Sequence, residues 1–188
     1  MAVYTKINKK EISYINKKFE IDTITKFKGI KQGIENTNYL LKSKNKKFIL
    51  TIFEKRVSQK EIPFFMKLMD QLNSSKINCP KPLKNKNGNY LIKIKNKTAC
   101  IVSFLSGKDK KSLNLKNCYD IGKLIAEMHQ STKKINLFRK NSMGIKNLNP
   151  LLNSIKFKSK KFTNIEKFLK ANFKDIKNKW PKKLPNGI

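Results

Sequence analysis

The chain has 188 residues, of which 38% are hydrophobic and 10% aromatic, and a formal net charge of +32. This content is too apolar for a disordered chain, yet no run approaches the ~18 apolar residues that would cross a bilayer. The charge alone would indicate a nucleic-acid surface. However, only Arg56 and Arg139 are arginines, and the lysines are spread along the whole chain with many Asn, Ile and Phe. That distribution favours a codon bias with solvated lysines, and a basic nucleic-acid-binding protein remains the alternative.

Cysteine usage points to a reducing compartment. Cys79, Cys100 and Cys118 lie far apart, and the chain has one His. No zinc-ligand spacing is present, and the first ten residues contain no apolar run typical of a secretion signal. The sequence therefore predicts a cytoplasmic protein with reduced thiols.

Helical and extended patterns alternate in the first half of the chain. Asn8 and Glu11 form a capping pair that predicts a helix to about residue 19. Extended patterns over residues 19–30, 36–43 and 47–53 predict an antiparallel meander. Ser58 and Glu61 form a second capping pair, which predicts a helix to about residue 73. An extended connector at residues 79–82 and two strands at 90–95 and 98–105 complete a predicted five-stranded sheet.

Helical patterns dominate after Ser106 and Gly107. Residues 114–131 predict an amphipathic helix, and weaker patterns predict helices over 150–157 and 164–179, followed by a loop at 180–188. The expected organisation is a sheet lobe over residues 1–105 and an incomplete helical lobe over residues 106–188.

The segment between the first two predicted strands contains residues suited to phosphate groups. Gly33 permits close backbone approach, and Asn36, Thr37 and Asn38 add polar donors. Lys42 falls on the same strand face as Asn38 by alternation. The alternative is an ordinary hairpin with turn-forming residues and a solvated lysine, because the segment is neither a Walker A loop nor a GxGxxG loop.

Two further strands suggest nucleotide contacts. Thr51 stands on the third strand, where kinase-like enzymes place a phosphate-binding lysine. The apolar strand ending in Ser103, Phe104 and Leu105 runs into a glycine, as does the adenine-binding hinge of a two-lobed kinase. The alternative is a central strand that simply ends in a turn.

The remaining candidates are weaker. Glu61 could pair with a lysine across the sheet, but it also fits the capping pair. His129 ends a helix without an evident partner, so packing or capping competes with a general-base role. The acidic residues of the second half show no metal-ligand clustering: Asp109, Asp120, Glu127, Glu166 and Asp175.

Several blocks resemble bacterial homoserine kinases of the aminoglycoside-phosphotransferase-like type. The most specific are residues 35–39, Glu-Asn-Thr-Asn-Tyr, and residues 51–56, Thr-Ile-Phe-Glu-Lys-Arg. The resemblance covers essentially the whole chain, including residues 27–34, 63–65, 78–82, 101–107 and 121–129.

The resemblance implies an α+β, two-lobed protein-kinase-like fold with one helix packed on the five-stranded sheet. It also implies phosphorylation of the L-homoserine hydroxyl by ATP with Mg²⁺, with no nucleic-acid or membrane partner. A kinase of another small hydroxyl or amino substrate is the nearest alternative. In the family the catalytic loop and metal ligands follow a segment like residues 180–188. We therefore expect them beyond Ile188, and we expect the 188-residue chain to be inactive.

Overall fold

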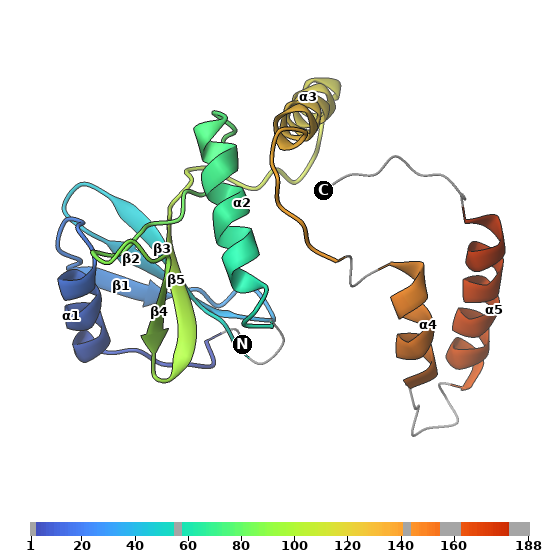
Figure 1. The fold of residues 1–188 in the computed structure, drawn as a ribbon, viewed down its shortest axis with the longest axis horizontal. Helices are drawn as coiled ribbons and strands as arrows, with labels where there is room; N and C mark the ends of the chain where they lie inside the picture. Colours follow the sequence, from blue (N-terminus) through green and yellow to red (C-terminus); the bar gives the residue numbers. More distant parts are fainter. Residues whose placement is uncertain (1–2, 55–57, 141–143, 155–162, 181–188) are drawn as a thin grey trace. The chain divides into compact units, whose positions relative to one another are not determined.

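The computed structural model describes residues 3–54, 58–140, 144–154 and 163–180, and the chain forms two compact units, residues 1–137 and 138–188. The first unit contains a five-stranded antiparallel sheet of order β1-β2-β3-β5-β4, so the fold is α+β (Figure 1). The elements of the first unit are α1 (Lys9–Lys18), β1 (Lys26–Gly29), β2 (Thr37–Lys42), β3 (Lys47–Ile52), α2 (Ile62–Ser74), β4 (Leu91–Ile94), β5 (Lys97–Ser103) and α3 (Leu115–Thr132). The second unit contains α4 (Ile145–Ser154) and α5 (Thr163–Lys179).

Alternation along the central strands directs side chains to two faces of the sheet. One face carries Leu41, Leu50 and Ile101, which cluster with Ile15 of α1 and with Phe19, the residue that caps its C-terminal end. The other face packs against α2 through a second cluster of Ile62, Met66, Cys100 and Val102. Helices α1 and α2 therefore cover opposite faces (Figure 1), whereas the sequence predicted one packed helix. Replacing a fully buried leucine of this core by alanine costs about 2–5 kcal/mol.

The first predicted strand is shorter than its pattern. Residues 19–30 were expected to be extended, but β1 spans only Lys26–Gly29. The preceding segment is tied to α1 instead: the N–H of Ile24 donates to Asn16 Oδ1 at 2.9 Å, and Asn16 Nδ2 donates to the Ile24 carbonyl at 3.3 Å. The alternation of apolar and polar residues does not predict these two hydrogen bonds between Asn16 and Ile24.

Helix starts were predicted with mixed success. The Asn8 and Glu11 capping box is present at α1. The Ser58 and Glu61 capping box is wrong, because Glu61 is itself the N-cap of α2 and makes no side-chain cap hydrogen bond. A backbone hydrogen bond from the Glu61 N–H to the Ser58 carbonyl forms a turn there, and a proline in the first helical turn fixes the helix start.

The last three helices agree with the predicted regions. The side chains of Asn114 and Asn117 cap α3 reciprocally, but α3 has no buried residue, and Leu115 is 90% exposed. Helix α4 starts five residues before the predicted 150, and residues 155–157 of that prediction lie outside the described part of the chain. Helix α5 agrees within one residue and carries Glu166–Lys170 and Asp175–Lys179 ion pairs. No helix among the described residues is long and apolar enough to span a membrane.

Candidate functional site

A hollow of about 490 Å³ lies beside the β1–β2 hairpin and the end of β5. Leu40 and Phe104 give it apolar walls, and Lys28 and Lys31 bring positive charge. A second hollow of about 480 Å³ shares Lys28 and Leu40 and extends to Lys42. Apolar walls with convergent cations suit a ligand that has a flat apolar ring and an anionic group.

A larger hollow, of about 840 Å³, lies elsewhere on the first unit, among Phe19, Phe48 and residues 81–84. Its rim mixes acidic and basic side chains, including Asp70. The Asp70 carboxylate accepts a hydrogen bond from the Tyr90 hydroxyl at 2.6 Å. Burial and this bond raise the pKa of Tyr90 to about 12, so the Tyr90 hydroxyl keeps its proton and acts as the donor. None of the residues singled out from the sequence lines this hollow, so we assign the candidate site to the hairpin.

Glycines allow the close backbone path of the hairpin. Gly33 has a φ of +108°, which L side chains rarely adopt. At Gly29 a Cβ would lie 2.9 Å from Cγ2 of Val3, so a larger residue would collide with that side chain. The Ile30 N–H donates to the Asn38 carbonyl at 2.9 Å and extends the ladder by one residue beyond β1.

The structure brings together several residues singled out from the sequence. Thr51 pairs in register with Asn38, and its hydroxyl donates to Asn38 Oδ1 at 2.8 Å. Asn36 Oδ1 accepts the N–H of Glu54 at 3.3 Å. Lys42 lies two residues beyond Leu40 and lines the adjoining hollow. Of these residues only Lys42 lines a hollow, whereas Asn38 shares its strand with Leu40 and Thr51 stands on the neighbouring strand β3.

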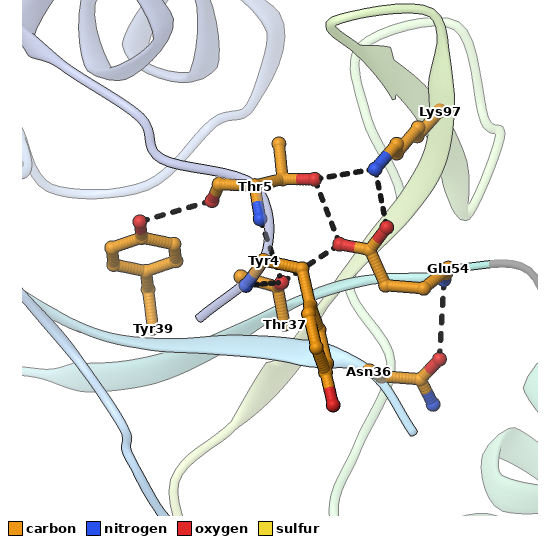
Figure 2. A network of polar contacts seen from close by, with 7 residues as sticks. All are labelled: Tyr4, Thr5, Asn36, Thr37, Tyr39, Glu54 and Lys97. Atoms are coloured by element: carbon orange, nitrogen blue, oxygen red, sulfur yellow. Dashed lines mark hydrogen bonds and ion pairs between the residues drawn. The ribbon is translucent and has the colours of Figure 1, made fainter. Parts of the chain in front are cut away.

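Thr37 is placed differently from its neighbours. Its side chain is fully buried on the sheet face opposite Asn38. The hydroxyl donates to Glu54 Oε1 at 2.7 Å and accepts the N–H groups of Tyr4 and Thr5 at 2.9 and 3.1 Å (Figure 2). The hydroxyl is thus committed to internal hydrogen bonds, which leaves the Thr37 main chain as the group that could meet a ligand.

Ser103, the last residue of β5, and the two residues that follow it differ in the hydrogen bonds that their main chains make. Ser103 is tied to the connector, because its N–H donates to the Lys81 carbonyl and its Oγ accepts the Lys81 N–H, both at 2.8 Å. Phe104 donates its N–H to the Lys47 carbonyl at 3.2 Å, and its ring lines the first hollow. Leu105 is 41% exposed, and within the described chain its N–H and carbonyl make no hydrogen bond. A main-chain edge of this kind can pair with a heterocyclic base.

Glu54, just after β3, is a residue that the sequence reasoning did not single out. Its carboxylate accepts hydrogen bonds from Thr5 and Thr37, each at 2.7 Å, and forms an ion pair with Lys97 (Figure 2). Burial alone would raise the pKa of Glu54, but the hydrogen bonds from Lys97 and the two threonines outweigh it and lower the pKa below its ordinary value. The three partners come from positions 17, 43 and 49 residues away, so no local spacing could have found them.

The other polar candidates do not assemble into a metal centre. Among the described residues, no three His, Cys, Asp or Glu side chains lie close enough together to hold a metal ion. His129 lies in the last turn of α3, where its carbonyl accepts the Thr132 hydroxyl at 3.0 Å. The carboxylate of Glu54 is occupied by its hydrogen-bond donors and by Lys97.

Comparison of the amino-acid sequence with known proteins finds relatives that match along the whole chain. The chain is 32% identical over its full length to the homoserine kinase of Parvibaculum lavamentivorans and 33% identical to that of Brucella anthropi. It spans only 59% and 58% of those two proteins.

Solved structures share the fold. An AMP-bound spectinomycin phosphotransferase aligns with a TM-score of 0.62 at 15% identity, over 96% of this chain and 61% of that one. A microcompartment-associated aminopropanol kinase aligns with a TM-score of 0.59 at 14% identity, over 77% of this chain and 48% of that one. Residues 26–188 match the phosphotransferase enzyme family (APH). The chain therefore belongs to the phosphotransferase enzyme family.

Proposed function

We propose that the chain is the nucleotide-binding part of a homoserine kinase, which transfers the γ-phosphoryl group of ATP to the hydroxyl of L-homoserine in threonine biosynthesis. The observation that carries this proposal is the similarity of the full chain to relatives named homoserine kinase. Because the chain spans less than three fifths of those relatives, we assign the activity to a longer polypeptide in the cytoplasm, with ATP and L-homoserine as small-molecule partners.

The residues that line the two hollows support separate contacts for the adenine and for the phosphates of ATP. In this proposal the side chains of Phe104 and Leu40 and the free main-chain groups of Leu105 hold the adenine, because the Ser103 and Phe104 N–H groups are already bonded to Lys81 and Lys47. The loop from Gly33 to Asn38, with Thr51 and Lys42, faces the phosphates. Apolar walls next to backbone donors and lysines match the two halves of a nucleotide. Residues 1–105 then form the nucleotide-binding lobe, and residues 106–188 supply the first helices of the second lobe.

We place the catalytic base and the Mg²⁺ ligands in the longer polypeptide beyond Ile188, because in the family that the chain resembles they follow a segment like residues 180–188. Mg²⁺ would supply charge neutralisation at the transferred phosphoryl group. The residues of this chain would bind and orient the nucleotide. The 188-residue chain is therefore expected to bind ATP without turnover.

A calorimetric titration of the 188-residue chain with ATP tests the nucleotide site. Phe104→Ala removes the apolar wall, and we expect ATP affinity to fall by about tenfold, the value of one buried aromatic contact of roughly 1.4 kcal/mol. Phe138→Ala is the matched control, because Phe138 is 89% exposed and lies in the second unit. Equal affinities for both variants would contradict the assignment of adenine to this hollow.

The substrate needs the longer polypeptide. Phosphorylation of L-homoserine, compared with aminopropanol and spectinomycin, distinguishes a homoserine kinase from a kinase of another small hydroxyl or amino compound, the alternative suggested by the names of the fold relatives. The high positive charge keeps a nucleic-acid-binding function as a second candidate. Strong DNA binding at physiological salt, without ATP binding, would favour that candidate.

A further inference from the structure

The N-terminal segment of residues 3–7, here called the strap, touches the β1–β2 hairpin on both sides of its loop. Val3 packs against Gly29, where even a Cβ atom would come within 2.9 Å of its side chain. Tyr4 donates its hydroxyl hydrogen to the Ile34 carbonyl at 2.8 Å. The strap therefore contacts the end of β1 and the loop itself, although more than 25 residues separate these points from it in sequence.

The strap is anchored at the start of β2 and the end of β3. The N–H groups of Tyr4 and Thr5 donate to the hydroxyl of Thr37, and the Thr5 hydroxyl donates to Glu54. Lys97 donates to both the Thr5 hydroxyl and Glu54 (Figure 2). Each buried donor or acceptor in this network has a partner, so shifting the strap would leave several of them unsatisfied.

The network also reaches the loop through the main chain. The Glu54 N–H donates to Asn36 Oδ1, so the residue whose carboxylate anchors the strap also holds the last loop residue before β2. The Glu54 side chain is 10% exposed. Since Thr37 points away from Asn38 and Thr51, the strap supports the loop from the face opposite the hollows.

We propose that the strap fixes the loop of residues 30–36 in the conformation that binds the triphosphate, and that Tyr4, Thr5, Glu54 and Lys97 are positioning residues for the nucleotide. This inference rests on the proposed function, because it takes the loop as the phosphate-binding element. The four side chains act through the loop and do not touch the ligand. Weakening the strap should therefore affect ligands in proportion to their contacts with the loop.

Tyr4→Phe is the mildest test, because it removes only the hydrogen bond to the Ile34 carbonyl from a half-exposed ring. We expect amide hydrogen exchange of residues 30–36 to rise and ATP affinity to fall about three- to fivefold, as for the loss of one neutral hydrogen bond. AMP affinity should stay within twofold of the wild-type value. Tyr14→Phe makes the same chemical change on α1 and is the matched control, because Tyr14 contacts Lys18 and not the loop.

Thr5→Val is the stronger variant, since it removes a hydroxyl shared by Glu54 and Lys97. It should lower ATP affinity by about tenfold or more while AMP still binds, and its melting curve shows whether it remains folded at the assay temperature. If Thr5→Val does not fold, Tyr4→Phe alone decides the question.

The outcomes separate the two proposals. A wild-type chain that binds neither ATP nor AMP refutes the proposed function, and the positioning role with it. A wild-type chain that binds ATP, with Tyr4→Phe and Tyr14→Phe binding equally well, refutes the inference alone. Equal losses of ATP and AMP affinity would also overturn it, because a general loss of structure does not distinguish the phosphates.

Discussion

Replacing Thr37 by Val should destabilise the first unit strongly, although the two side chains have nearly the same shape. The substitution removes one buried hydroxyl that makes three hydrogen bonds, to Glu54, Tyr4 and Thr5. Losing a hydrogen bond to a carboxylate costs about 1.5–3 kcal/mol, and an unsatisfied buried N–H costs about 1–3 kcal/mol. The N–H of Tyr4 is only partly buried and can recover water. The expected total is therefore about 3 kcal/mol.

Unfolding of the first unit is best followed by the near-UV circular dichroism of tyrosine. All five tyrosines lie within residues 1–137, whereas the single tryptophan, Trp180, lies in the second unit. A loss of about 3 kcal/mol corresponds to a decrease in Tm of about 10 °C for a chain of this size. Urea titration of the same variants gives the free energy directly if the slope is unchanged.

Two control variants separate the hydroxyl from the methyl group of Thr37. Thr37→Ser keeps the hydroxyl and loses one buried methyl group, so it should cost about 1 kcal/mol. Thr25→Val removes an exposed hydroxyl with a long 3.4 Å contact and should change the stability by less than about 0.5 kcal/mol. If Thr37→Val costs no more than Thr25→Val, the network in Figure 2 does not stabilise the fold.

Three further predictions concern charge, thiols and the exposed helix. Because the pKa of Glu54 is lowered in the folded state, its stabilising contribution is complete above about pH 4.3, the ordinary value, and is lost as the pH falls through the folded value. The difference in unfolding free energy between wild type and Glu54→Gln should therefore shrink below about pH 4, and a constant difference down to pH 2 would contradict this. Burial raises the pKa of the Cys100 thiol to about 12. A thiol reagent at pH 8 should therefore modify the exposed Cys118 quickly and Cys100 only after unfolding. Mass spectrometry of digested samples measures the modification of each cysteine. The exposed apolar side chains of α3 should promote aggregation. The double variant Leu115→Lys, Tyr119→Lys should therefore be more soluble, with no decrease in the Tm of the first unit. Light scattering during heating measures the aggregation.

Sequence patterns were sufficient where the governing interactions are local. The reciprocal cap of Asn8 and Glu11 and the alternation of β2 and β3 each depend on neighbours a few residues apart. These signals predicted β2, β3, β4 and β5 near their observed positions, whereas β1 begins seven residues after its predicted start at residue 19. The sequence predicted the meander but not its register, in which Asn38 pairs with Thr51.

Only the tertiary structure decided which polar groups meet across the sheet. Strand alternation already places the Thr37 side chain on the face opposite Asn38, but only the tertiary structure shows that the strap and Glu54 meet it there. The partners of Glu54 come from three separate segments, and the shortest sequence separation among them is 17 residues. A lysine-rich sequence offers many equivalent cations to such a carboxylate. The choice of Lys97 follows from the β4–β5 turn that places this residue next to the end of β3, and a turn can do so only after the strands have paired.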